Sequence, residues 1–221
     1  MIISTDHIDT PGLRIRQHQA AIDAAITAGV HHLFYTSMLN PEQSLIPFAA
    51  DHLETEAAIE RSGDPFTILR VSWYTETLSP MIASAFDTGT WHTCAGDGRI
   101  NYVARNDVAS AAAAALASRS AVPERIDVTG PQPLSISEIV AITERLAAAP
   151  IDVVQVTDDE RRSGALAAGI SDAIVPLLVA SEANARAGNF DVTSSAVEDL
   201  TGAAATSVEA FLAANKVMWQ P

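Results

Sequence analysis

Lysine is almost absent from this 221-residue sequence. Twelve of the 13 basic residues are arginine, and the one lysine, Lys216, lies five residues before the end. A mechanism that needs a lysine in the body of the fold is therefore excluded. The 27 acidic residues give a net charge of −14, which repels phosphodiester backbones and anionic lipids. We expect no direct nucleic-acid partner and no membrane surface as a partner.

Cysteine occurs once, as Cys94, so no internal disulfide can form. A lone thiol fits a reducing compartment better than an oxidising one. The first residues lack a basic segment followed by a long apolar core, which predicts neither a signal peptide nor an anchor. No run of about 18 apolar residues follows. Together these absences predict a cytoplasmic protein.

Several catalytic and metal-binding motifs are also missing. The sequence has no G-x-S-x-G elbow, no P-loop and no H-E-x-x-H. Of the six histidines, His31 and His32 fall on successive positions of a predicted strand and would point to opposite faces. The other four have no partner at H-x3-H or C-x2-C spacing, so we expect no metal site.

What is present is the composition of one globular domain. Hydrophobic residues make up 48% and charged residues 18% of the chain, which is enough for a single sizeable core. Apolar periodicity predicts helices over 13–28, 48–62, 81–87, 108–117, 136–148, 159–167, 172–187 and 208–214. Strands are predicted over 1–4, 30–37, 66–72, 100–104, 125–129 and 151–156. This alternation indicates an α/β fold with a parallel sheet, followed by a mostly helical lobe.

Two helix starts carry local signals. Asn106 and Asp107 are predicted to cap the helix over 108–117, because such side chains accept hydrogen bonds from free backbone N–H groups. Ser135 and Glu138 have the spacing of a capping box for the helix over 136–148.

The candidate site lies at the carboxyl ends of two predicted neighbouring strands, where open α/β sheets bind ligands. One loop carries residues 36–38 and the other residues 72–75. The helix between them places His52, Glu56 and Glu60 on one face. The alternative interpretation is a solvated polar face with an ordinary histidine.

Four segments, at 20–37, 51–76, 95–116 and 128–143, resemble the NmrA-like branch of the atypical short-chain dehydrogenase/reductases. Within it, the likeness is to the NADPH-dependent quinone oxidoreductase 2 type. The resemblance implies a Rossmann-type parallel sheet over 1–130 and a substrate lobe over 131–221. It also implies hydride transfer from NADPH, with NAD as the alternative cofactor, to a small quinone-like molecule without flavin. A non-catalytic NAD(P)-sensing regulator of the NmrA type is the alternative.

The same resemblance assigns roles to five residues. Thr36 and Ser37 would lie against the nicotinamide end of the cofactor. His52 occupies the place where many relatives have a lysine that reaches the ribose and nicotinamide. Trp73 and Tyr74 match the segment that passes over the nicotinamide and faces the substrate. His52 and Tyr74 are the catalytic candidates.

The chain departs from the family pattern at the residue that serves as general acid in typical short-chain dehydrogenases. Where a typical short-chain dehydrogenase has a tyrosine four residues before a lysine, this sequence has Phe48 and His52. The phenol whose pKa a neighbouring cation lowers is therefore missing. A quinone needs less assistance, because its hydroquinone anion is stabilised and can take a proton from water or from His52.

The second departure is at the front. The family begins with a strand, the fingerprint G-x-x-G-x-x-G and a helix that receives the diphosphate, whereas Met1 aligns with the start of the family's fourth strand. We expect about seventy residues of the family fold to be missing, either through a mis-assigned start or as a real truncation. In the second case, the exposed edge at 1–4 predicts homo-oligomerisation.

Overall fold

A computed structural model describes residues 1–8 and 10–219 of the chain. Its α-helices are α1 (Leu13–Thr27), α2 (Ala49–Ser62), α3 (Leu78–Thr88), α4 (Arg105–Ala117), α5 (Ile136–Ala147), α6 (Asp158–Ala167), α7 (Val175–Arg186), α8 (Ala196–Thr201) and α9 (Val208–Ala214). Its strands are β1 (Leu33–Met38), β2 (Phe66–Val71), β3 (Thr90–Thr93), β4 (Arg99–Ile100), β5 (Arg125–Val128), β6 (Leu134–Ser135) and β7 (Asp152–Gln155). Two short 3-10 helices, Thr75–Thr77 and Lys216–Met218, complete the set.

The main sheet is parallel, with the order β1-β2-β5. All six residues of β1 are buried, as expected for a strand covered on both faces. A single parallel bridge from Ile2 to Tyr35 extends the sheet beyond β1. Next to it, Ile3 keeps 71% of its surface exposed. Self-association through this edge stays a prediction.

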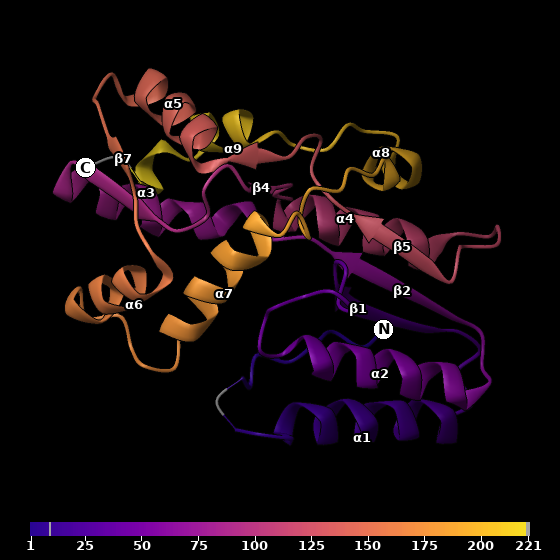
Figure 1. The fold of residues 1–221 in the computed structure, drawn as a ribbon. Helices are drawn as coiled ribbons and strands as arrows, with labels where there is room; N and C mark the ends of the chain where they lie inside the picture. The colour runs from indigo at the N-terminus through magenta and orange to yellow at the C-terminus, as the bar shows by residue number, and fades with distance from the viewer. Residues whose placement is uncertain (9, 220–221) are drawn as a thin grey trace.

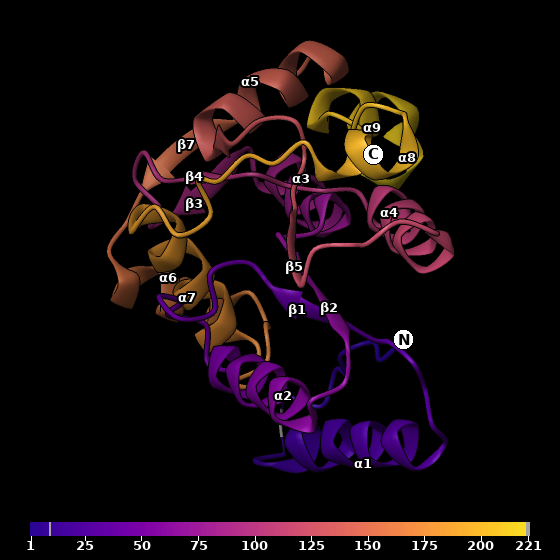
Figure 2. The same cartoon turned by 90° about the vertical axis from the view of Figure 1, so that its right-hand side faces the viewer.

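Helices cover both faces of the sheet. Figures 1 and 2 show α1 and α2 side by side on one face, with α4 and α8 on the other. The first face is closed by Ile22 of α1 and Ile59 of α2 against Tyr35 and Ile68. The second is closed by apolar residues of β2, β5, α4 and α8. The predicted α/β fold with flanking helices is confirmed.

A second apolar core lies beyond the end of the sheet. It joins α3, α5, α7 and α9, a parallel pair β3-β7 and an antiparallel pair β4-β6. Trp219 is 1% exposed and stacks on Phe86, with ring centroids 6.0 Å apart. This lobe therefore draws on segments from both sides of residue 130.

Local details differ from the sequence predictions. Strand β1 begins at Leu33, so His31 and His32 precede it, and Thr36 and Ser37 lie within the strand rather than in a loop. Strand β3 was not predicted. The capping box of Ser135 and Glu138 is confirmed.

The predicted cap at Asn106 and Asp107 is wrong. Helix α4 begins at Arg105, whose backbone N–H donates to the Glu76 carboxylate at 3.0 Å. Because the carboxylate that accepts from this backbone N–H comes from outside the helix, the residues next to the helix start could not predict the cap. Asp107 instead accepts hydrogen bonds from the backbone N–H and hydroxyl of Thr206.

Candidate functional site

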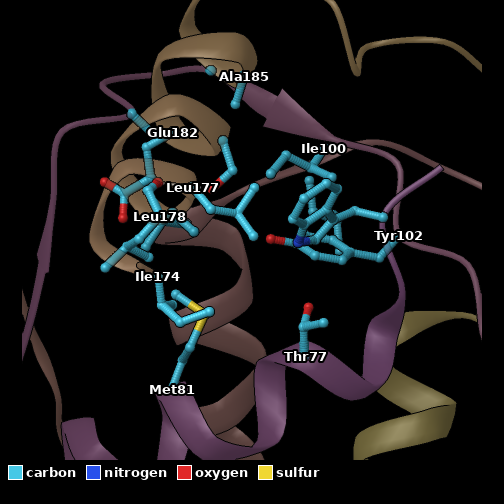
Figure 3. A pocket seen from close by; sticks show the side chains of 15 residues that line it. Thr77, Met81, Ile100, Tyr102, Ile174, Leu177, Leu178, Glu182 and Ala185 are labelled. Carbon is cyan, nitrogen blue, oxygen red and sulfur yellow. Dashed lines mark hydrogen bonds between the residues drawn. The ribbon is translucent and has the colours of Figure 1, made fainter. Parts of the chain in front are cut away.

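A cavity of about 170 Å³ lies between α7 and the segments that leave the main sheet (Figure 3). One wall is the apolar side of α7. The facing wall is built from the β2–α3 connection, β4 and the start of α5. The lining residues are Trp73, Thr77, Met81, Ala95, Gly98, Ile100, Tyr102, Leu134, Ile136, Ile174, Leu177, Leu178, Ser181, Glu182 and Ala185.

Close backbone contact sets the position of α7. A Cβ atom on Gly98 would lie 2.5 Å from the backbone carbon of Ala185 and the backbone nitrogen of Arg186. Glycine at 98 is therefore required for α7 to approach the loop before β4. This approach closes one end of the cavity.

The lining is almost entirely apolar, and most of its polar groups are engaged elsewhere. The Thr77 hydroxyl donates to the carbonyl of Tyr74 at 2.7 Å, and the Ser181 hydroxyl donates to the carbonyl of Leu178 at 2.8 Å. A 150 Å³ apolar cavity accepts benzene, so this one has room for a single flat ring with small substituents. The arrangement suits a neutral aromatic ligand.

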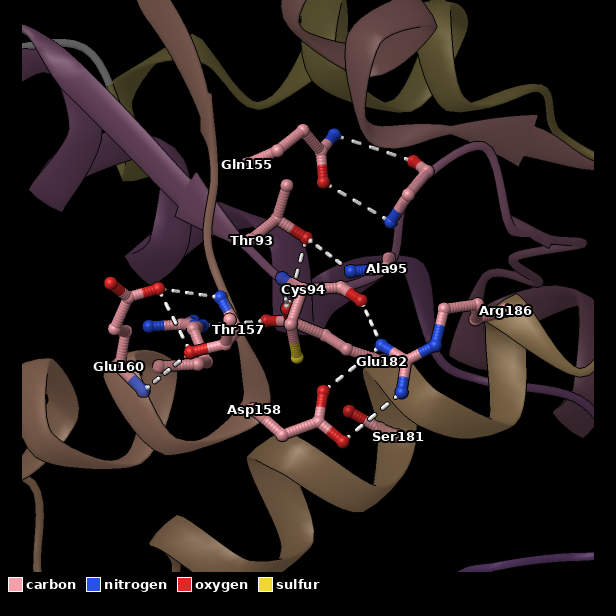
Figure 4. A network of polar contacts seen from close by, with 12 residues as sticks. Thr93, Cys94, Ala95, Gln155, Thr157, Asp158, Glu160, Ser181, Glu182 and Arg186 are labelled. Atoms are coloured by element: carbon pink, nitrogen blue, oxygen red, sulfur yellow. Dashed lines mark hydrogen bonds and ion pairs between the residues drawn. The ribbon is translucent and has the colours of Figure 1, made fainter.

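Glu182 ties α7 to the rest of the lobe (Figure 4). The Glu182 residue is 4% exposed. One carboxylate oxygen accepts hydrogen bonds from the Thr93 hydroxyl at 2.9 Å and from the Cys94 N–H at 2.5 Å. Its second oxygen accepts from Arg161 Nε of α6 at 2.8 Å. One buried carboxylate therefore fixes α6, α7 and the end of β3 together.

A second ion pair lies beside this carboxylate. Arg186 binds Asp158 at 3.0 Å and donates to the carbonyl of Cys94 (Figure 4). Burial and the Glu182 carboxylate raise the pKa of the Cys94 thiol to about 12. At neutral pH the thiol is protonated and a poor nucleophile.

Trp73 and Tyr74 occupy opposite environments, because successive side chains of an extended segment alternate. Trp73 lines the cavity and packs against Phe190, with ring centroids 5.6 Å apart. Tyr74 packs with the α4–α8 side of the sheet, where the Arg105 guanidinium lies 5.1 Å from its ring centroid. Burial raises the pKa of the Tyr74 phenol.

His52 lies in a buried polar cluster on the other face of the sheet. Its Nε2 is 2.7 Å from Arg14 Nη2, and its Nδ1 is 2.9 Å from the Tyr35 hydroxyl. Burial, with a smaller contribution from Arg14, lowers the pKa of His52 to about 3. Both His52 and Glu56 are buried, so the solvated-face interpretation is wrong for them.

Thr36 and Ser37 are likewise engaged within the chain. The Thr36 hydroxyl oxygen accepts from the backbone N–H of Ser4 at 3.0 Å. The Ser37 hydroxyl donates to Glu56 at 2.5 Å, and Glu56 binds Arg70 at 2.6 Å. Of the five residues singled out from the sequence, the cavity lining includes Trp73 alone. The cofactor roles of the others stay predictions.

Sequence reasoning missed Tyr102 and Glu182. Tyr102 lies in a segment predicted as a strand, and a tyrosine there is typical of a half-buried surface. Glu182 is an acidic residue within an apolar helix, and this was the one feature of the sequence that could have indicated its role.

In the described residues, no three His, Cys, Asp or Glu side chains gather in a way that could hold a metal ion. Across the same residues, no helix has the length and apolar character to cross a membrane.

The buried histidines predict a loss of stability in mild acid. Burial, helped by Arg14, lowers the pKa of His18 to about 4, and that of His52 falls to about 3, from an ordinary 6.5. Below about pH 6.5 the unfolded chain binds protons that the folded chain does not, so falling pH favours unfolding. From pH 7 to pH 5 we expect each histidine to remove up to about 2 kcal/mol of the free energy of unfolding.

Urea denaturation at the two pH values measures this loss. The double variant His18→Gln/His52→Gln should have a smaller pH dependence than the wild type. Replacement of the exposed His7 by Gln should leave the dependence unchanged. Equal slopes for the wild type and the double variant would show that these histidines are not its source.

The parallel sheet and its helical layers match the α/β fold of Rossmann-like NAD(P)-binding reductases. The chain belongs to the NmrA-like family, which matches residues 1–212.

Two relatives show how close the likeness is. Quinone oxidoreductase 2 of Escherichia coli (strain K12) is 26% identical over 208 residues, covering 94% of this chain and 72% of the relative. The structure of E. coli NADPH-dependent quinone oxidoreductase QOR2 complexed with NADPH superposes with a TM-score of 0.90 over 97% of this chain and 75% of that chain. The structure of Citrobacter sp. triphenylmethane reductase complexed with NADP(H) superposes with a TM-score of 0.88. It is 30% identical in sequence, and the match covers 95% of this chain and 73% of that chain.

Proposed function

We propose that this chain acts as an NAD(P)H-dependent oxidoreductase of the quinone reductase type, with a small quinone-like acceptor held in the cavity. The observation that carries the proposal is the apolar, single-ring-sized cavity lined by Trp73 and Tyr102. It lies in a fold whose relatives include an NADPH-dependent quinone reductase and a reductase of aromatic dyes. Those two relatives favour NADP over NAD.

The residues present fit one end of such a cofactor. The cavity has room for the acceptor ring alone, so the nicotinamide ring would lie at its opening, beside the partly exposed Trp73 indole. Thr36, Ser37 and His52, whose polar groups are bonded within the chain, are proposed to support the nicotinamide end of the cofactor from β1 and α2. Within the described residues, no glycine-rich turn leads from a strand into a helix, so we assign no diphosphate contact.

The chemistry then depends on position and exclusion of water. A bound NADPH would supply the hydride that, with one proton from solvent, reduces the quinone to the hydroquinone and leaves NADP⁺. The apolar lining keeps the quinone ring in contact with the Trp73 indole and excludes water that would compete for the cavity. His52 holds Arg14 and Tyr35 in place and does not deliver the proton, because its imidazole is neutral at ordinary pH.

Quinone-dependent oxidation of NADPH by the full chain tests the proposal. We expect turnover with a simple benzoquinone, and a loss of at least about tenfold in kcat/KM in Trp73→Ala, since the indole surface is removed. Val217→Ala, at a side chain that is 92% exposed, is the matched control and should leave the rate unchanged. Absence of turnover both by this chain and by a form extended upstream through a glycine-rich strand-turn-helix would rule out the reductase.

The same protein distinguishes the remaining candidates by its melting temperature. Stabilisation by NADP(H) without turnover on any quinone would identify a sensor of the NmrA type. A melting temperature unaffected by millimolar NADP(H) would indicate neither function, because a ligand that binds the folded state alone must stabilise it.

A further inference from the structure

The hydroxyl of Tyr102 is one of two polar side-chain groups on the cavity lining that have no hydrogen-bond partner within the described residues, the other being the indole N–H of Trp73. The residue is 3% exposed, and among the described residues nothing accepts or donates a hydrogen bond at its hydroxyl. Figure 3 shows this hydroxyl directed into the cavity, towards the side of α7. The hydroxyls of Thr77 and Ser181 both donate to backbone carbonyls, and the Glu182 carboxylate is held by Thr93, Cys94 and Arg161.

The backbone around Tyr102 is rigidly held. The next residue, Val103, donates its N–H to the carbonyl of Trp73 at 2.9 Å and accepts from the N–H of Thr75 at 3.0 Å. The carbonyl of Tyr102 itself lies against Gly130. The phenol is therefore placed before any ligand arrives, which lowers the entropic cost of binding.

The chemistry of this group selects its partner. Burial and the Glu182 carboxylate raise the pKa of the Tyr102 phenol, so it stays an O–H donor. Because this donor faces an apolar cavity, a ligand that offers it an acceptor is favoured over one of the same shape that does not. In an apolar cavity of single-ring size, the acceptor that satisfies it without burying a charge is a carbonyl oxygen on a flat ring. Glu182 on the same lining disfavours an anionic ligand.

We propose that Tyr102 is the specificity-determining residue of this cavity, donating a hydrogen bond to the carbonyl oxygen of a neutral aromatic ligand. This inference rests on the proposed function only in that the cavity is taken to hold the acceptor. The sequence prediction placed Tyr74 in the segment that faces the substrate, and this inference adds Tyr102 as the residue that contacts the ligand carbonyl. It requires no redox step.

A pair of ligands of equal shape isolates this hydrogen bond. Acetophenone carries a carbonyl oxygen where α-methylstyrene carries a CH₂ group, and neither is reduced or attacked by a thiol under the conditions of a titration. Affinities of both are measured by titration calorimetry for the wild type, Tyr102→Phe and Tyr74→Phe. We expect the acetophenone-to-α-methylstyrene affinity ratio to fall about tenfold in Tyr102→Phe and to be unchanged in Tyr74→Phe.

An unchanged ratio in Tyr102→Phe would overturn the proposal, as would a failure of both ligands to bind the wild type. A second measurement covers the case in which Tyr102→Phe does not fold. The chain has three tyrosines, so 3-fluorotyrosine labelling gives three ¹⁹F resonances, assigned with Tyr35→Phe and Tyr74→Phe. Acetophenone should shift the Tyr102 resonance more than α-methylstyrene does, and equal shifts would contradict the proposal.

Neither ligand experiment uses a cofactor. A normal preference for the carbonyl with no NADPH oxidation by this chain or by its extended form would leave the role of Tyr102 standing and remove the reductase. Turnover of quinone with an unchanged acetophenone-to-α-methylstyrene affinity ratio in Tyr102→Phe would support the reductase and remove the role of Tyr102. The two failures are thereby distinguishable.

Discussion

Gly130→Ala is expected to lower the free energy of unfolding by more than about 3 kcal/mol, or to prevent folding. A Cβ atom on this residue would lie 1.9 Å from the carbonyl oxygen of Tyr102 and 3.0 Å from Asn101 Oδ1. The first atom is backbone and cannot rotate away. Asn101 also holds the carbonyl of Val192 at 2.8 Å, so a shift of this segment breaks contacts on both sides.

Urea denaturation monitored by circular dichroism measures the effect. Gly164→Ala is the matched control, because Gly164 lies within α6 and a Cβ atom there meets nothing within 4 Å. Alanine should stabilise that helix by about 0.5–1 kcal/mol. A loss below about 1 kcal/mol in Gly130→Ala would mean that the loop relaxes and that Tyr102 is not held by this contact.

Arg161→Met is expected to cost about 3 kcal/mol of the free energy of unfolding, because it leaves the Glu182 carboxylate buried without its cation. The side chains of this pair are 13% and 5% exposed, whereas those of Arg145 and Glu209 are 57% and 51% exposed. Arg145→Met removes a pair at a similar distance, 2.9 Å against 2.8 Å, and should change stability by less than about 1 kcal/mol.

A compensating variant separates lost attraction from stranded charge. In Arg161→Met/Glu182→Leu no unpaired carboxylate remains, so most of the stability should return. If the double variant is as unstable as Arg161→Met, the hydrogen bonds from Thr93 and Cys94 to Glu182 contribute more to stability than the removal of the unpaired charge restores. Equal losses in Arg161→Met and Arg145→Met would show that burial does not strengthen the first pair.

The fold was largely predictable because its signals are local. Strand β2, the helix between β1 and β2, and the capping box at Ser135 all follow from apolar periodicity and turn residues within a few positions. Strand β3 was missed because Thr90–Thr93 is short and finds its partner at Asp152–Gln155. The start of α4 was misplaced because Glu76, far along the chain, satisfies its first N–H.

The candidate site was predictable only in part. Trp73 was found because it follows a strong strand in a recognisable segment. The alternation that places Tyr74 on the opposite side depends on where the strand ends, which a sequence locates poorly. His52 looked exposed, since its burial needs Arg14 of α1 and Tyr35 of β1 to meet it. Tyr102 gave no signal at all, because an empty hydrogen-bonding position is a property of the folded state.

The pairing of β3 with β7 also sets an order of events on the ribosome. Thr90 leaves the exit tunnel long before Asp152, its neighbour in the sheet, and Phe86 must wait for Trp219. Strands β1, β2 and β5 can pair first, because the last of them ends at Val128, whereas α8 covers one face of this sheet only later. Until Trp219 emerges, the core that surrounds the cavity is incomplete and its apolar residues stay accessible to chaperones and proteases.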